Sequence, residues 1–187
     1  MKKVILFLVL LLTLCVVLGL AGCTTPPLTL TYTVGDTGGP AGGLIFYDKG
    51  SYSDGWRYLE AAPSDQSTGI QWYNGNYVVT GATGTAIGTG QANTTAIVTM
   101  QGAGSYAAQL CNNLTEGGYD DWFLPSKDEL NKLYINRVGV GGFADCDYWS
   151  SSEYNAFNAW YQNFGTMATR VYYNKNYNLR VRAVRAF

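Results

Sequence analysis

The sequence predicts an α+β domain behind an N-terminal secretory leader. Residues 44–47 and 56–61 are short apolar segments with the alternation of strands. In the middle of the chain, residues 105–114 and the segment beginning at Ser126 carry apolar side chains at helical spacing. The last forty residues return to short aromatic segments broken by Asn and Gly. Two helices and a mainly antiparallel sheet are therefore expected.

The first 22 residues are typical of a lipoprotein signal peptide. Two lysines precede an apolar run at residues 4–20, and small residues lead directly into Cys23. A transmembrane helix is the alternative, but small residues before a cysteine are what a lipoprotein signal peptidase needs to approach the backbone. We expect cleavage before Cys23, lipid on its sulfur, and attachment to the membrane through that lipid. Because Thr24 and not an acidic residue follows, resemblance to other lipoproteins implies the outer membrane, with the domain facing the cell surface.

The mature chain suits one domain. Cleavage leaves 165 of 187 residues, enough for a sizeable core, and shifts the net charge from −1 to −3. No basic field remains to attract nucleic acid. Residues 23–34 are expected to be a short lipid-anchored tether with two prolines, and residues 35–187 the folded domain.

The predicted elements follow in order. A glycine-rich turn leads into the strand at 44–47, which should form a hairpin with 56–61. Residues 78–99 are rich in Gly, Thr and Ala without helical period and are expected to be an ordered loop or weak strands. A helix over 105–114 should stop at the glycines that follow it. The second helix begins at Ser126, where Glu129 three positions on predicts a capping box.

The sequence contains few residues that could carry out catalysis. The chain contains no histidine, which excludes the usual nucleophilic triads. A glycosidase could draw carboxylates from Asp120-Asp121 and Asp128-Glu129, but the first pair follows a glycine turn and the second suits a helix N-terminus. Calcium at the turn acids lacks a recognisable loop pattern. We predict no catalytic residue, no metal and no cofactor.

Two cysteines remain beyond the lipid site. In an exported protein Cys111 and Cys146 could form a disulfide, or each could be buried separately as a small apolar residue. The sequence does not decide between these, because pairing depends on the distance between the two Cα atoms.

The C-terminal region predicts a binding surface. Tyrosine supplies rigid contact area and asparagine supplies adaptable hydrogen bonds, the composition of antibody paratopes. The alternative is ordinary strand tyrosine with asparagine in turns. The expected ligand is an unidentified extracellular protein or glycan. The predicted ligand-binding residues are Tyr154, Asn155, Phe157, Asn158, Tyr161, Asn163, Arg170, Tyr172, Tyr173, Asn174, Asn176 and Tyr177.

Several motifs in fixed order resemble a known family. They include Gly-Gly-Leu-Ile-Phe-Tyr at 42–47, Trp-Phe-Leu-Pro-Ser-Lys-Asp-Glu-Leu at 122–130, Tyr-Trp-Ser-Ser-Ser-Glu at 148–153 and Val-Arg-Ala-Val-Arg-Ala-Phe at 181–187. The chain from about residue 35 is similar to the C-terminal domain family of the Lcl collagen-like adhesin. The resemblance implies a C-type lectin-like fold, in the version shared with formylglycine-generating enzymes. The calcium-dependent sugar motifs of true C-type lectins are absent, so that activity does not carry over.

The resemblance also implies three possible functions. Some members are variable proteins of diversity-generating retroelements, in which adenines of a C-terminal repeat are rewritten. Here Trp160, Phe164 and most of the last five residues have adenine-poor codons, whereas the residues between are largely reachable from an Asn codon; Met167 does not fit. A fixed adhesin for glycans or sulfated polysaccharide is the alternative, weakened by the net charge of −3. An enzyme of formylglycine-generating type would need a reactive cysteine pair.

Overall fold

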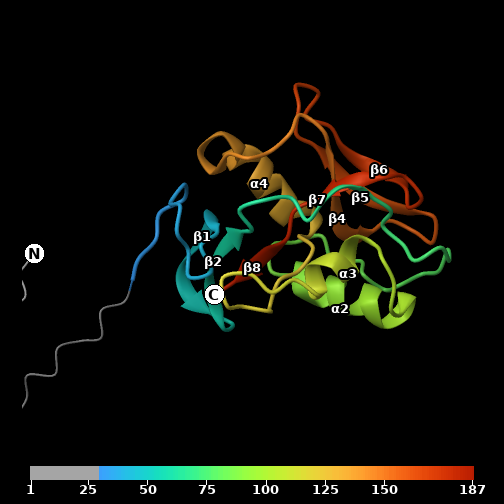
Figure 1. Ribbon diagram of the computed structural model, residues 1–187, viewed down its shortest axis with the longest axis horizontal. Coiled ribbons are helices and arrows are strands. Elements are labelled where there is room, and N and C mark those ends of the chain that lie inside the picture. The colour runs from blue at the N-terminus through green and yellow to red at the C-terminus, as the bar shows by residue number, and fades with distance from the viewer. Residues whose placement is uncertain (1–29) are drawn as a thin grey trace, which may run out of the picture. The chain divides into compact units, whose positions relative to one another are not determined.

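The computed structural model describes residues 30–187, and Tyr32–Phe187 form one compact unit. The predicted signal peptide, Cys23 and the tether up to residue 29 lie outside the described residues. No helix in the described part of the chain is long and apolar enough to cross a membrane. The domain is α+β, with the architecture expected of a C-type lectin-like arrangement (Figure 1).

The smaller sheet confirms the predicted N-terminal hairpin. Strand β1 (Leu44–Ser53) pairs antiparallel with β2 (Trp56–Ala61), and β2 pairs with β8 (Val184–Ala186). The hairpin turns through Asp54 and Gly55, both at positive φ, 51° and 86°. This is the Asp-Gly sequence that a two-residue hairpin turn prefers, because both central residues need positive φ.

The larger sheet holds the C-terminal strands in the order β3-β7-β4-β5-β6. As predicted, neighbouring strands run mainly antiparallel; the exception is β4, which pairs in parallel with β7. Because β6 ends this order, it is an edge strand, and Figure 1 shows it on the side of the domain away from β1 and β2. The strands are β3 (Ser67–Ile70), β4 (Asp147–Glu153), β5 (Asn158–Asn163), β6 (Arg170–Asn174) and β7 (Leu179–Val181).

The prediction of two helices was wrong, because the described chain forms three. Helix α2 (Gly90–Gln101) occupies part of the segment expected to be a loop or weak strands. Its buried side chains include Asn93 and Thr94, which hydrogen-bond to the backbone of Gly84 and Leu124. A helix that buries amides and hydroxyls against backbone groups shows no apolar stripe, which is why the pattern missed it. Helix α3 (Ala107–Asn112) is shorter than the predicted 105–114.

The predicted capping box is confirmed at the start of α4 (Lys127–Val140). Ser126 Oγ accepts from the Glu129 amide at 3.3 Å, and the Ser126 amide donates to the Glu129 carboxylate at 2.6 Å. The same carboxylate accepts from the amides of Gly88 and Gly90 at 2.7 and 3.4 Å. One buried side chain therefore caps α4 and fixes the backbone that enters α2.

The core lies in two clusters, and the C-terminal segment contributes to both. One surrounds Trp72, Trp122 and Trp149, and the other places α4 against β1 and β2. Two arginines of the last residues are buried among these clusters: Arg185 bonds to Glu60 and Asp121, and Arg182 bonds to Asp65. The end of the chain is thus fixed, and the β5–β6 hairpin projects from a rigid base.

Candidate ligand-binding surface

The β5–β6 hairpin presents aromatic side chains on two faces. Ala159 lies opposite Tyr173 and Trp160 lies opposite Tyr172 in an uninterrupted antiparallel register. Successive residues of a strand point to opposite faces, so Tyr172 and Tyr173 belong to different surfaces. Every residue of β6 except the half-buried Asn174 is exposed.

On one face, Tyr154, Trp160 and Tyr172 form what we call the Trp160 cluster. The rings of Tyr154 and Tyr172 stack with centroids 3.8 Å apart and planes 3° apart, and Trp160 stands edge-on to both. The Lys127 ammonium lies 3.6 Å above the Trp160 ring, a cation–π contact from the first turn of α4. These contacts hold the rings in place and leave their outer faces to solvent.

On the other face, Tyr161, Tyr173 and Tyr177 form the Tyr173 cluster. Ring centroids are 5.0 Å apart for Tyr161 and Tyr173, and 4.5 Å apart for Tyr173 and Tyr177. Tyr161 is only 8% exposed, so it supports the other two from below. The two outer rings are available for contact.

A third group, the Tyr77 cluster, consists of Tyr73, Tyr77 and Phe157. Tyr77 stacks on Tyr73 at 4.7 Å and lies 5.3 Å from Phe157. Its hydroxyl donates to the side-chain oxygen of Asn174 at 2.7 Å. A loop far from the C-terminus in sequence is thereby joined to the predicted surface.

Eight of the twelve predicted ligand-binding residues are exposed, Asn158 and Asn174 are half-buried, and the other two make contacts within the domain. Tyr161 is buried, and Asn163 turns away to donate to the Asp147 carboxylate at 2.6 Å. Two asparagines form turns, as the alternative interpretation expected: the side-chain oxygen of Asn155 accepts from the amides of Phe157 and Asn158, and that of Asn174 from Asn176. The exposed members are Tyr154, Asn155, Phe157, Arg170, Tyr172, Tyr173, Asn176 and Tyr177.

The structure adds residues that sequence reasoning missed. Trp160 is not among the predicted ligand-binding residues, yet it is part of an exposed aromatic cluster. Lys127 and Asp128 were interpreted as a helix start, yet Lys127 covers Trp160 and Asp128 pairs with Arg170 at 3.0 Å. No local sequence pattern around Tyr77 indicates that it belongs to a binding surface. Nothing in the sequence around these residues indicates their neighbours, because each contact joins distant segments.

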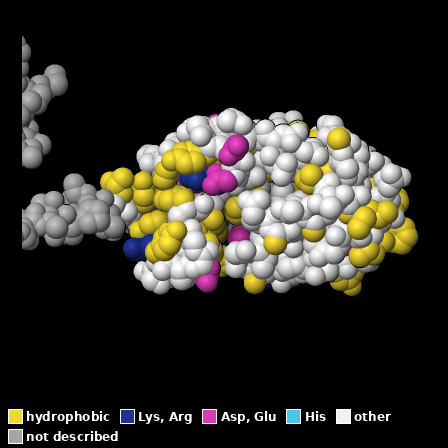
Figure 2. Space-filling model, turned by 90° about the horizontal axis from the view of Figure 1, so that it is seen from below, with side chains coloured by type: hydrophobic (Ala, Val, Ile, Leu, Met, Phe, Trp, Pro, Cys, Tyr) yellow, Lys and Arg dark blue, Asp and Glu magenta, His cyan; other side chains and the backbone are white. Residues whose placement is uncertain are grey.

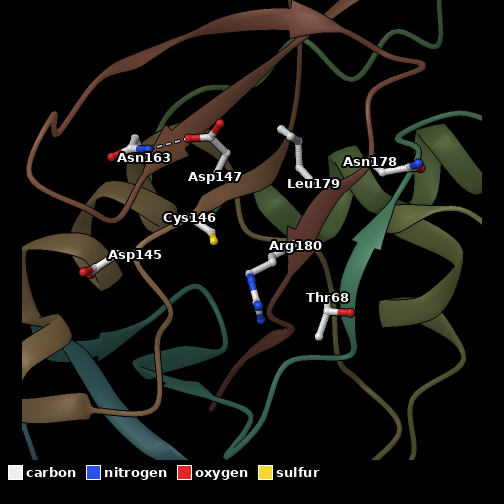
Figure 3. A pocket seen from close by; sticks show the side chains of 8 residues that line it. All are labelled: Thr68, Asp145, Cys146, Asp147, Asn163, Asn178, Leu179 and Arg180. Carbon is white, nitrogen blue, oxygen red and sulfur yellow. Dashed lines mark hydrogen bonds between the residues drawn. The ribbon is translucent and has the colours of Figure 1, made fainter.

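A polar pocket of about 390 Å³ lies beside the surface, where Asn163 meets Asp147 (Figure 3). Cys146 is exposed there, whereas Cys111 is fully buried in α3 and burial raises the pKa of its thiol. Both cysteines are free. No disulfide joins them, and Cys111 is buried as a small core residue.

Three of the four carboxylates considered for catalysis make structural contacts, including Asp128, which pairs with Arg170. Asp121 pairs with Arg185, and Glu129 caps α4. Within residues 30–187, no group of three or more His, Cys, Asp and Glu side chains is placed to hold a metal ion.

A buried ion pair anchors the hairpin that carries the surface. Lys175 Nζ lies 2.5 Å from the Glu153 carboxylate, and both side chains are almost completely buried. Glu153 also accepts from the amides of Thr80 and Gly81, and Lys175 donates to the Val78 carbonyl at 3.1 Å. Burial lowers the pKa of Lys175, while the Glu153 carboxylate opposes that change. The pair ties the turn after β6 to the loop that follows Tyr77.

Replacing Lys175 with Met should destabilise the domain by about 3–5 kcal/mol, because it leaves the Glu153 carboxylate buried without a counter-charge. Urea denaturation followed by tryptophan fluorescence measures this. Asn176→Ala is the control: this neighbouring side chain is exposed, and its loss should cost less than about 0.5 kcal/mol. Equal stability of the two variants would contradict an anchoring role for Lys175.

Comparison with known proteins matches the chain to one family model and to no curated protein. A search of curated proteins found no match. The family described as Lcl C-terminal domain matches residues 62–185, which span the segment from the end of β2 into β8. The chain therefore belongs to the Lcl C-terminal domain family.

Proposed function

We propose that this protein is a surface-displayed lipoprotein that binds an extracellular ligand through the three aromatic clusters around the β5–β6 hairpin. Membership of the Lcl C-terminal domain family indicates an adhesin-like surface protein and not a known enzyme family. The observation that carries the proposal is the gathering of exposed rings around one hairpin: the Trp160 cluster lies on one face, the Tyr173 cluster on the other, and the Tyr77 cluster is joined to them through Asn174.

The exposed aromatic area favours binding on energetic grounds. Tyr154, Phe157 and Tyr177 are 48%, 56% and 50% exposed, although large rings are stabilised by leaving water. Contiguous apolar patches on soluble proteins mark interaction sites. Tyrosine also offers a hydroxyl at the wet end of an apolar ring, which suits a surface that is solvated before binding. A protein or a glycan could use both properties.

The arrangement of the domain suits display from a membrane. The described chain begins beside the β1–β2 sheet, and β6 lies on the opposite side of the domain (Figure 1). Figure 2 shows hydrophobic side chains at both ends of the domain, and charged side chains lie among those near the start of the described chain but not among those at the opposite end. A lipid on Cys23 would attach the domain to a membrane through the predicted tether at residues 23–34. The outer membrane of a double-membrane bacterium is part of the proposal because Thr24, and not an acidic residue, follows Cys23.

As part of this proposal, the C-terminal surface is diversified by a retroelement. Trp160 has a codon without adenine, so it would stay constant while Tyr172 and Asn176 change around it. The structure supplies one constraint on this scheme: Lys175 has an adenine-containing codon, yet its side chain is 0% exposed and paired with Glu153. Variants at position 175 should therefore fold poorly, and selection should keep lysine there.

The DNA around the gene provides the test. We expect a non-coding repeat that matches the last hundred or so bases and differs from them mainly at its adenines, together with a reverse transcriptase gene. Strains should differ at Tyr172 and Asn176 and agree at Trp160 and Lys175. If the repeat and the reverse transcriptase gene are both missing, the surface is a fixed adhesin site.

Removing both stacked rings should weaken ligand binding. We expect Tyr154→Ala with Tyr172→Ala to lower affinity at least tenfold, because the pair supplies the flat face of the Trp160 cluster. The probes are a glycan array, immobilised heparin and phage-displayed random peptides, applied to the chain from residue 23 with Cys23→Ser.

The matched control for that double variant is Tyr52→Ala, a ring that is 71% exposed at the far hairpin. The Tyr52→Ala protein should bind the same probes with unchanged affinity. Equal loss in both proteins would contradict the aromatic surface. Strong, salt-sensitive retention on heparin would instead favour the alternative, a fixed adhesin for sulfated polysaccharide.

Lipid attachment at Cys23 predicts that Cys23→Ala abolishes incorporation of labelled palmitate and leaves the leader uncleaved. Gel mobility and mass spectrometry of the intact protein measure both effects. Cys15→Ala, a change inside the leader, should leave labelling intact. If the Cys23→Ala protein still carries label, the acylation site lies elsewhere.

A further inference from the structure

The outer edge of β6 offers unpaired backbone groups. The Lys175 amide donates to the Phe157 carbonyl and the Asn163 amide donates to the Thr169 carbonyl. These bonds fix the alternation of the antiparallel ladder between them, so the amides and carbonyls of Val171 and Tyr173 face β5. Those of Arg170 and Tyr172 must point away from the sheet. No described residue outside the ladder donates to or accepts from them.

The edge of β6 has few of the features that protect a strand edge: the strand is short, but its one charged side chain, Arg170, pairs with Asp128. The β5–β6 register runs from Asn158–Asn174 to Gln162–Arg170 without a shift, whereas the β1–β2 and β4–β5 pairs each contain an irregularity. Residues 170–174 contain no proline and no lysine. Exposed, regular and unblocked strand edges are templates for pairing with another strand.

Resting on the function proposed above, we propose that the ligand is a protein that adds an extended segment to β6 as a further antiparallel or parallel strand. Main-chain hydrogen bonds from Arg170 and Tyr172 supply affinity that does not depend on side chains. Alternate side chains of the incoming segment contact the Trp160 cluster on one face and the Tyr173 cluster on the other. Sequence changes in those clusters would alter specificity while the backbone contacts stay the same.

Hydrogen-bond complementarity favours a polypeptide over a glycan at this edge. A strand presents an amide and a carbonyl together at every second residue, about 6.8 Å apart, which is the spacing that β6 exposes. Sugar hydroxyls have no such repeat. The aromatic clusters alone could bind either a polypeptide or a glycan. The unpaired backbone groups of the β6 edge therefore favour the polypeptide.

The experiment compares Arg170→Pro with Arg170→Ala in the chain from residue 23 carrying Cys23→Ser. Both variants lose the same side chain and its pairing with Asp128. Only proline also removes the outward amide, and proline is tolerated where a strand amide faces solvent. Circular dichroism and thermal unfolding should be the same for both variants.

The probe is a peptide selected on the unsubstituted domain from a phage library of random dodecamers. We expect Arg170→Pro to bind it at least tenfold more weakly than Arg170→Ala does. N-methylation of alternate amides of the peptide should abolish binding in one register and leave it unchanged in the other.

Equal affinity of the two variants would overturn strand addition, as would a library that yields no binder. If that peptide still requires Tyr154 and Tyr172, the proposed aromatic surface stands and only the strand edge fails. Strand addition would also be overturned if the domain bound only glycans on the array and no peptide. A second copy of this chain could also occupy the β6 edge, and sedimentation equilibrium tests for it. If the unsubstituted protein forms a dimer and Arg170→Pro dissociates that dimer, the edge binds a second copy of this chain and not another protein.

Discussion

Three buried glutamate carboxylates hold the glycine-rich loops of this domain against its sheets. Glu60 accepts from the amides of Ala41 and Gly43, Glu129 from those before α2, and Glu153 from those of residues 80 and 81. Loops that lack helical or ladder hydrogen bonds must satisfy their amides elsewhere, and a carboxylate can satisfy several at once. Glu60 and Glu153 are each neutralised by one buried cation, and Glu129 lies at a helix N-terminus. Without these residues, the segments that connect the sheets would have no fixed path.

This arrangement separates the scaffold from the surface. The Glu153–Lys175 pair is buried where β4 ends and β6 turns back, whereas most rings of the aromatic clusters are exposed and only Tyr73 and Tyr161 belong to the core. Lys175 is the exception, because it is buried in the core and yet sits between two exposed asparagine-rich segments. A surface built in this way can change its rings at little cost in stability, provided that the residue beneath the turn is kept.

Local patterns predicted the elements that depend on local chemistry. The hairpin of β1 and β2 follows from its alternation, and the start of α4 follows from Ser126 and Glu129, whose mutual hydrogen bonds need only a short segment of backbone. Helix α2 was not predicted because Asn93 and Thr94 on its buried face are held by hydrogen bonds to the backbone of Gly84 and Leu124 and not by apolar contact. Composition alone could not separate buried Tyr161 from exposed Tyr173, because the two rings lie diagonally across neighbouring strands, a relation that only the folded chain defines.

The sequence by itself determined the α+β class, the family, the hairpin, the capped helix and the tyrosine-rich character of the C-terminal strands. These depend on periodicity, turn chemistry and motifs that neighbouring residues share. Only the tertiary structure decided which rings are exposed, that Lys127 covers Trp160, that Tyr77 joins the surface, and that β6 is an open edge. Each of these is a contact, or the lack of one, between segments far apart in the chain, and such relations arise only when the whole domain packs.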